Sequence, residues 1–232
     1  MNIETNEALI RRNSRIAQFA MLGGLLVLAA GMFVSFQNPT QIGLSFGALL
    51  LGFVLSQVGI YYTNRWGRRP RPDELINKEL KGLDGRYSIY HYMTPTSHLL
   101  VGPAGVWVLM PRHQRGVITY SNGRWRQKGG NLYLKLFAQE GLGRPDLELS
   151  GELESVRSYL QKLLPDRELP PIYAALLFTN EKAEIQIDPQ EEPPAATLRL
   201  NDLKDQLRKS AKSKPISLTK VQEIRDAITT AN

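Results

Sequence analysis

Two long apolar runs near the start of the chain constrain its fold more than any other feature. Residues 16–36 form a run of 21 in which Gln18 is the only strongly polar side chain, and residues 42–62 form a second run of 21. A helix that rises about 1.5 Å per residue would span roughly 31 Å over each run, close to the hydrocarbon thickness of a bilayer. The connection, residues 37–41, is short, uncharged and broken by Pro39. We therefore expect a hairpin of two transmembrane helices, over residues 16–62.

Basic residues flank both runs and predict the orientation of the hairpin. Three arginines precede the first run, and four follow the second: Arg11, Arg12 and Arg15, then Arg65, Arg68, Arg69 and Arg71. Positive charge next to membrane spans stays on the cytoplasmic side. We expect a multi-pass protein of the cell (inner) membrane with both termini in the cytoplasm. A cleaved signal peptide is the competing interpretation, because residues 29–31 (Ala-Ala-Gly) resemble a cleavage region, but we expect the hairpin to be retained.

Small residues recur along both runs and are candidates for close helix packing. They are Gly24 and Gly31 in the first run, and Gly43, Gly47, Gly52, Ser56 and Gly59 in the second. Small residues spaced four apart let helix backbones approach closely. Either the two spans use them to pack on each other, or helices of another membrane protein dock there. Neither run contains a charged residue, which argues against a proton relay or an ion path.

The runs divide the chain into four parts. We expect a cytoplasmic segment (1–15), the membrane hairpin (16–62), a basic linker (63–72) and a cytoplasmic domain (73–232). Arg65, Arg68, Arg69 and Arg71 of the linker region would each add about 1 kcal/mol of attraction to anionic lipid headgroups. The same arginines are equally explained as a topology signal. The formal net charge of +7 suits anionic lipid or nucleic acid, and lipid is the simpler partner for a membrane protein.

The remaining chain reads as a domain of mixed helices and strands. Apolar periodicity predicts helices at 73–83, 148–164, 201–210 and 219–229, and strands at 86–92, 97–101, 105–110, 117–120, 124–127, 172–179 and 197–200. Asn122-Gly123 is a strong signal for a tight hairpin. Asn201 and the pair Thr219 and Gln222 are candidate helix caps. The segment 129–143 shows no regular pattern. This order predicts an α/β domain with a central mixed sheet.

One stretch resembles a known family. Residues 97–109 read Ser-His-Leu-Leu-Val-Gly-Pro-Ala-Gly-Val-Trp-Val-Leu, and residues 110–118 continue Met-Pro-Arg-His-Gln-Arg-Gly-Val-Ile. This is similar to the core of the nuclease-related domain (NERD) family, in which an Asp-His pair, apolar residues and Gly-Pro-x-Gly precede a strand that ends in Glu-x-Lys. The similarity covers about residues 73–230. It implies a restriction-endonuclease-like fold, in which carboxylates hold a divalent metal and a lysine polarises the attacking water.

The residues that this resemblance assigns to the metal site are largely replaced. The helix acid falls on Glu74, with Asp73 and Glu79 as weaker matches, and the strand aspartate falls on Ser97. The glutamate falls on Met110, and the lysine on Arg112. Magnesium needs oxygen ligands, and arginine is a poor substitute for a catalytic lysine. We also expect Pro111 to disturb the strand edge. The resemblance therefore implies a nuclease-like domain without catalysis, with no metal and no cofactor.

Other chemistry-bearing residues give weaker indications. The chain has no cysteine, which excludes disulfides and thiol nucleophiles. His91, His98 and His113 lie on different elements, so we do not expect a metal site. Trp125 lies among basic residues and would either stack on a base or cover the sheet, and we favour the second. We expect an accessory or scaffold subunit of a larger membrane protein assembly. The alternatives are a membrane-tethered nucleic-acid binder, which we do not favour, and an active nuclease with relocated ligands Glu74, Asp84 and Glu148.

Overall fold

The computed structural model describes residues 1–129 and 141–231, and it divides into two compact units. Residues 7–71 form a helical hairpin. Residues 1–6 join the residues after 71 in a sheet domain. The first six residues are thus part of the sheet domain, whereas the sequence suggested a separate segment over residues 1–15. The predicted irregular segment 129–143 lies mostly outside the described residues.

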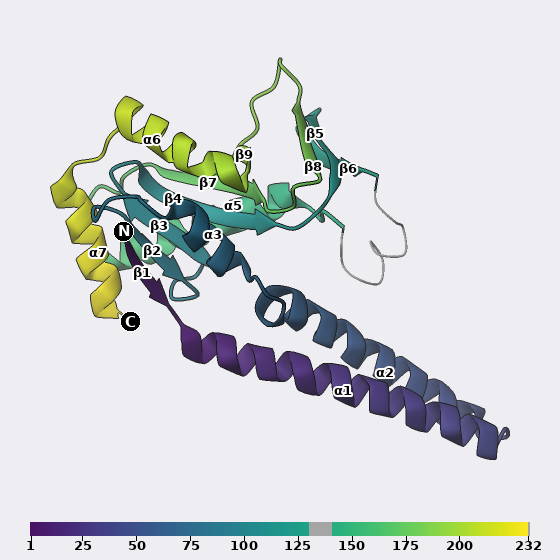
Figure 1. Cartoon of the computed structure of the whole chain (residues 1–232). Helices are drawn as coiled ribbons and strands as arrows, with labels where there is room; N and C mark the ends of the chain where they lie inside the picture. The colour runs from purple at the N-terminus through teal and green to yellow at the C-terminus, as the bar shows by residue number, and fades with distance from the viewer. Residues whose placement is uncertain (130–140, 232) are drawn as a thin grey trace. The chain divides into compact units, whose positions relative to one another are not determined.

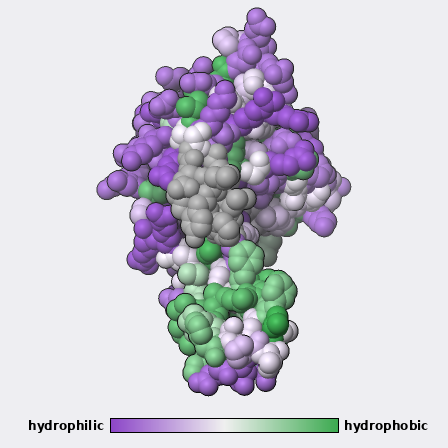
Figure 2. Space-filling model, turned by 90° about the vertical axis from the view of Figure 1, so that its right-hand side faces the viewer, coloured by the Kyte–Doolittle hydropathy of each residue, from purple (hydrophilic) through white to green (hydrophobic). Residues whose placement is uncertain are grey.

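The hairpin consists of α1 (Glu7–Gln37) and α2 (Ile42–Tyr62), and α2 continues into a π-helical turn, Thr63–Gly67 (Figure 1). Helix α1 begins nine residues earlier than the predicted span and has 31 residues. Both helices are long and apolar enough to cross a membrane by length and composition. Only 11% and 17% of their most apolar windows are buried, unlike the core helix of a soluble protein. Figure 2 shows hydrophobic residues gathered over this unit.

The sheet domain is built on a six-stranded mixed sheet in the order β1-β2-β3-β4-β7-β9. Its strands are β1 (Asn2–Thr5), β2 (Ser88–His91), β3 (His98–Gly102), β4 (Gly105–Arg112), β7 (Ile172–Phe178) and β9 (Ala196–Arg199). Strands β2, β3 and β4 are antiparallel neighbours, whereas β1, β7 and β9 each pair in parallel. The predicted α/β class with a central mixed sheet is therefore confirmed.

Helices cover both faces of this sheet (Figure 1). One face packs against α3 (Pro72–Leu80) and α6 (Leu203–Ser213) through a cluster that includes Ile76, Trp107 and Leu207. The other packs against α5 (Pro145–Leu163) and α7 (Leu218–Ala231) through a cluster that includes Val108 and Leu160. Alternate residues of β4 enter opposite clusters, as the two-residue period of a strand requires. Burial of each large aliphatic side chain contributes about 1.5–3 kcal/mol.

A second sheet of three strands has the order β6-β5-β8. Strands β5 (Gly116–Ser121) and β6 (Arg124–Lys128) form the predicted hairpin, in which both turn residues, Asn122 and Gly123, have positive φ. Strand β8 (Ala183–Ile187), which was not predicted, pairs in parallel with β5. A short 3-10 turn, Leu200–Asp202, precedes α6.

Both predicted helix caps are misplaced. Asn201 lies inside the 3-10 turn, and Asp202 is the residue before α6. Helix α7 begins at Leu218, and the hydroxyl oxygen of Ser217 accepts a hydrogen bond from the backbone N–H of Lys220 at 3.3 Å. A serine that directly precedes a helix can accept a hydrogen bond from the backbone N–H of the third helical residue. This bond satisfies one of the N–H groups that have no partner inside the helix. The capping residue thus precedes the predicted one.

Candidate functional site

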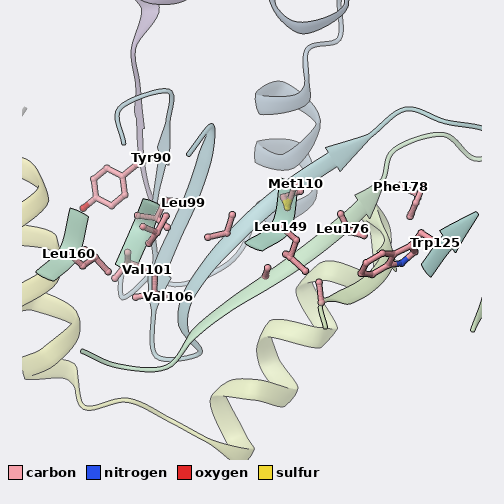
Figure 3. Packing of buried hydrophobic residues seen from close by; sticks show 14 of the residues in the cluster. Tyr90, Leu99, Val101, Val106, Met110, Trp125, Leu149, Leu160, Leu176 and Phe178 are labelled. Atoms are coloured by element: carbon pink, nitrogen blue, oxygen red, sulfur yellow. The ribbon is translucent and has the colours of Figure 1, made fainter. Parts of the chain in front are cut away.

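Met110 lies in β4, where the resemblance places a metal-binding glutamate. Its side chain is 8% exposed and belongs to the core cluster that also contains Leu149 of α5 and Leu176 of β7 (Figure 3). A thioether is only a weak hydrogen-bond acceptor, and it is not an oxygen ligand of the kind that magnesium prefers. The position therefore serves as part of the hydrophobic core.

Arg112, where the resemblance places a lysine, is held by an ion pair. Its Nη2 atom lies 2.6 Å from the Oε2 atom of Glu148 in the first turn of α5. The Arg112 side chain is 15% exposed and that of Glu148 is 48% exposed, so the pair connects β4 to α5 at the domain surface. An acidic residue in the first turn also interacts favourably with the helix dipole. The guanidinium of Arg112 is thus bound to a carboxylate of the same chain.

Pro111 does not disturb β4, contrary to the prediction. The strand continues to Arg112, and Pro111 and Arg112 pair with Leu177 and Phe178 of β7. The register with β3 ends at Val108 of β4. Proline lacks a backbone N–H, but a strand tolerates it where no neighbour needs that donor. Pro111 therefore lies where β4 has a paired neighbour on one side only.

Glu74 and Ser97 do not complete a metal site with these residues. Glu74 belongs to α3, which packs on the sheet face opposite to the one that Met110 enters. Ser97 precedes β3, and its backbone carbonyl accepts a hydrogen bond from the N–H of Tyr92 at 2.8 Å. Within residues 1–129 and 141–231, no three histidine or acidic side chains come together in a way that could hold a metal ion.

The relocated ligand set, Glu74, Asp84 and Glu148, is not assembled either. Asp84 binds Arg86 through its Oδ2 atom, which lies 2.6 Å from Nη2 and 3.0 Å from Nε of the guanidinium. This hydrogen bonding holds the pKa of Asp84 below its usual range. Glu148 is bound to Arg112 on another part of the domain. Two of the three proposed ligands thus have cationic partners of their own.

A buried histidine pair is the main polar feature that sequence reasoning missed. The antiparallel register of β2 and β3 places His91 opposite His98, and their Nδ1 atoms lie 2.8 Å apart. The Nε2 atom of His91 lies 2.9 Å from Oδ1 of Asn77 in α3. Both imidazoles are buried, with 0% and 1% exposure. The pair and Asn77 therefore form a hydrogen-bonded network beneath α3.

The contacts of this network limit which ring nitrogens carry protons. Because Oδ1 of Asn77 only accepts, the contact with His91 requires a proton on Nε2 of that ring. A hydrogen bond between the two Nδ1 atoms requires that one of them donates and the other accepts. The backbone carbonyl of His91 also accepts from Asn6 N–H at 3.0 Å. The network thus joins α3, β2, β3 and the residue that directly precedes α1.

The structure separates the small residues of the hairpin into two groups. A Cβ atom added at Gly31 would lie 2.6 Å from the Cβ of Ala48, and one at Gly24 would lie 2.8 Å from Oγ of Ser56. The buried residues Ser45, Gly52 and Gly59 of α2 recur every seven residues, the spacing of a helix–helix seam. At Gly43 and Gly47, an added Cβ would meet nothing within 4 Å. Gly24, Gly31, Gly52, Ser56 and Gly59 therefore form the seam, and Gly43 and Gly47 lie outside it.

The four arginines after α2 are not equivalent. Arg68 and Arg69 are exposed, whereas Arg71 is only 7% exposed, and its Nη2 atom lies 4.0 Å from Oε1 of Glu7. Arg65 lies over the ring of Trp66, with Cζ 5.2 Å from the ring centroid. The expectation that all four face lipid is thus wrong for Arg71, because its side chain is buried.

Trp125 of β6 is buried at 7% exposure, packs against Tyr120, and donates from Nε1 to the Thr197 hydroxyl at 3.2 Å. It covers the sheet, as predicted, and its faces are not open to a nucleic-acid base.

No known protein family, curated protein or solved structure matches the chain.

Proposed function

We propose that the chain is a non-catalytic, membrane-anchored accessory subunit of a larger membrane protein assembly. The proposal depends on how the small residues of the hairpin are distributed. Five of them form the seam between α1 and α2, whereas Gly43 and Gly47 leave open space on the surface of α2. Two small residues four apart permit close approach of another helix. Because no side chain of the hairpin fills that space, a helix of a partner subunit is the occupant that the geometry favours.

Several features support a cytoplasmic orientation of both termini. Arginines flank the hairpin at both ends, and such charge stays inside. Tyr61, Tyr62 and Trp66 contact one another at the end of α2, with ring centroids 5.1–6.1 Å apart. Aromatic side chains gather at membrane interfaces. The pairing of β1 with β2 also requires the N-terminus and the sheet domain to lie on the same side.

The non-catalytic role rests on the positions that the NERD resemblance assigns to the metal site. The order α3, β2, β3, β4, α5, β7 supports the nuclease-like domain that the resemblance implies. Met110 supplies core packing in place of a carboxylate, and Arg112 is bound to Glu148. A metal-dependent cleavage reaction would need a hard-cation site that these side chains do not provide. A nucleic-acid binder that stacks bases on Trp125 is disfavoured because that ring is buried.

Purification from native membranes in mild detergent, with mass spectrometry of the proteins that co-migrate, tests the proposal. We expect a stoichiometric membrane partner that is lost from the variant Gly43→Leu/Gly47→Leu. The matched control is Leu44→Ala/Leu51→Ala, which changes two exposed apolar residues of the same helix. Recovery of the native chain as a lone monomer would reject the accessory role.

Orientation is tested separately with single cysteines, since the chain has none of its own. A cysteine at Gln41, between the helices, should react with an impermeant maleimide in intact cells. A cysteine at Asn2 should react only after the membrane is opened. Labelling of both in intact cells would refute the cytoplasmic placement of the N-terminus.

A further inference from the structure

The outer strand of the three-stranded sheet carries a row of cations. Within the described residues, β6 pairs only with β5, and Figure 1 shows it at the side of that sheet. Arg124, Arg126 and Lys128 are exposed, whereas Trp125 between them is buried. Because side chains alternate along a strand, the three cations share one face at intervals of about 6.7 Å.

The cations of this row are not held in ion pairs within the described part of the chain. No ion pair joins Arg124, Arg126 or Lys128 to an acidic side chain there. Their cross-strand partners on β5 are uncharged, namely Ser121, Thr119 and Val117. Within the three strands of this sheet the acidic residue is Glu184, which lies one strand further away on β8. The edge of β6 therefore combines unpaired backbone groups with three cations that form no ion pair within the described residues.

The turn at the end of this strand already holds a carboxylate. Glu191 accepts hydrogen bonds from the backbone N–H of Asn122 at 2.6 Å and of Gly123 at 2.9 Å, one on each carboxylate oxygen. The positive φ of both turn residues directs these two N–H groups to one side, and successive N–H groups of this kind form an anion-binding concavity. One carboxylate of the chain itself is thus bound at the turn of this hairpin.

We propose that β6 receives an extended acidic segment of a partner protein, which adds as a further strand and places alternate carboxylates opposite Arg124, Arg126 and Lys128. A strand edge offers both N–H donors and C=O acceptors, and another polypeptide strand satisfies both. A phosphate backbone satisfies only the donors, and no exposed aromatic ring on β6 could stack a base. This site goes beyond the accessory role and stands whether or not other helices bind the hairpin.

Fluorescence anisotropy on the full chain in nanodiscs of neutral lipid tests the proposal. The probe is a peptide in which glutamate and threonine alternate, and its control is a block peptide with the same composition and charge. Each matched charge pair should tighten binding about 1.4- to 5-fold, so three pairs should favour the alternating peptide by at least about threefold. Methylation of its backbone nitrogens on one edge should remove this advantage.

Two variants locate the binding surface. Arg126→Gln should weaken binding of the alternating peptide about 1.4- to 5-fold. Arg157→Gln removes the same charge from an exposed position of α5 and should leave binding unchanged. Equal affinity for the alternating and block peptides would overturn the proposal, since it would indicate non-specific attraction. Tighter binding of single-stranded DNA of equal charge would indicate a nucleic-acid surface. Absence of all binding would show that the cations only guard the edge against aggregation.

Discussion

Gly31→Ala provides the sharpest test of the hairpin seam. The new methyl carbon would lie 2.6 Å from the Cβ of Ala48, well inside the 3.5–4.0 Å at which carbon atoms attract one another. Neither Cβ can rotate away, because each is fixed to its helix backbone. The helices would therefore have to separate by about 1 Å, and the close contacts at Gly24 and Gly52 would loosen with them.

Two opposing effects determine how much Gly31→Ala changes the stability of the hairpin. Overpacking of a tight contact costs about 1–3 kcal/mol, while glycine to alanine in a helix gains up to about 1 kcal/mol. Gly47→Ala has the same helix-propensity gain and no overpacking, since nothing lies within 4 Å of its added Cβ. The propensity term cancels between the two variants. Gly31→Ala should thus be about 1–3 kcal/mol less stable than Gly47→Ala.

Separation of the helices can be followed by pyrene excimer fluorescence. Cysteines introduced at Leu22 and Val58, which are both exposed, would carry the labels, and sodium dodecyl sulfate would titrate the helices apart. The double variant Gly31→Ala/Ala48→Gly moves the methyl group to the other helix and should recover most of the loss. Identical midpoints for Gly31→Ala and Gly47→Ala, or no rescue by Ala48→Gly, would refute the seam.

Three further predictions concern the sheet domain and are measured by denaturant unfolding. His91→Phe should destabilise it by about 1–3 kcal/mol for each buried group left without its partner, while His113→Phe, at an exposed position, should have little effect. Arg112→Met should cost less than about 1 kcal/mol because Glu148 is half-exposed and the pair is screened by solvent; a larger loss would contradict this. Asp84→Asn should cost less than about 1 kcal/mol at neutral pH. Since the folded pKa of Asp84 is lowered, its contribution is present above the unfolded pKa of about 3.9 and disappears as the pH falls through the folded pKa; a loss independent of pH would contradict the assignment.

The sequence identified the elements whose signal is local. The hairpin around Asn122-Gly123 and the buried strand β7 both appear within a few residues of their predicted bounds. In each case, turn chemistry or an unbroken apolar run specifies the structure without help from distant residues. Strand β8 had such a signal too, because Ala183, Ile185 and Ile187 alternate with polar residues.

The histidine network could not be predicted because it depends on register. Seven residues separate His91 from His98 in sequence, and only the antiparallel pairing of β2 and β3 brings their rings together. The third member, Asn77, reaches them because α3 packs across the sheet. A single-residue shift in register would turn one ring to the opposite face. Local patterns do not contain that information.

Strand β1 had the weakest sequence signal of the strands, yet its pairing with β2 decides where the start of the chain lies. Asn2, Glu4 and Thr5 are polar, and the strand gains its place through backbone pairing with β2 and the hydrogen bond from the Met1 ammonium to the Leu83 carbonyl at 3.1 Å. Asn6 follows directly and leads into α1, while α2 leads through its π-helical turn towards α3 of the same domain. Pairing of β1 with β2 therefore brings the first six residues of the chain into the same compact unit as the residues after 71, and no local sequence pattern predicts that association.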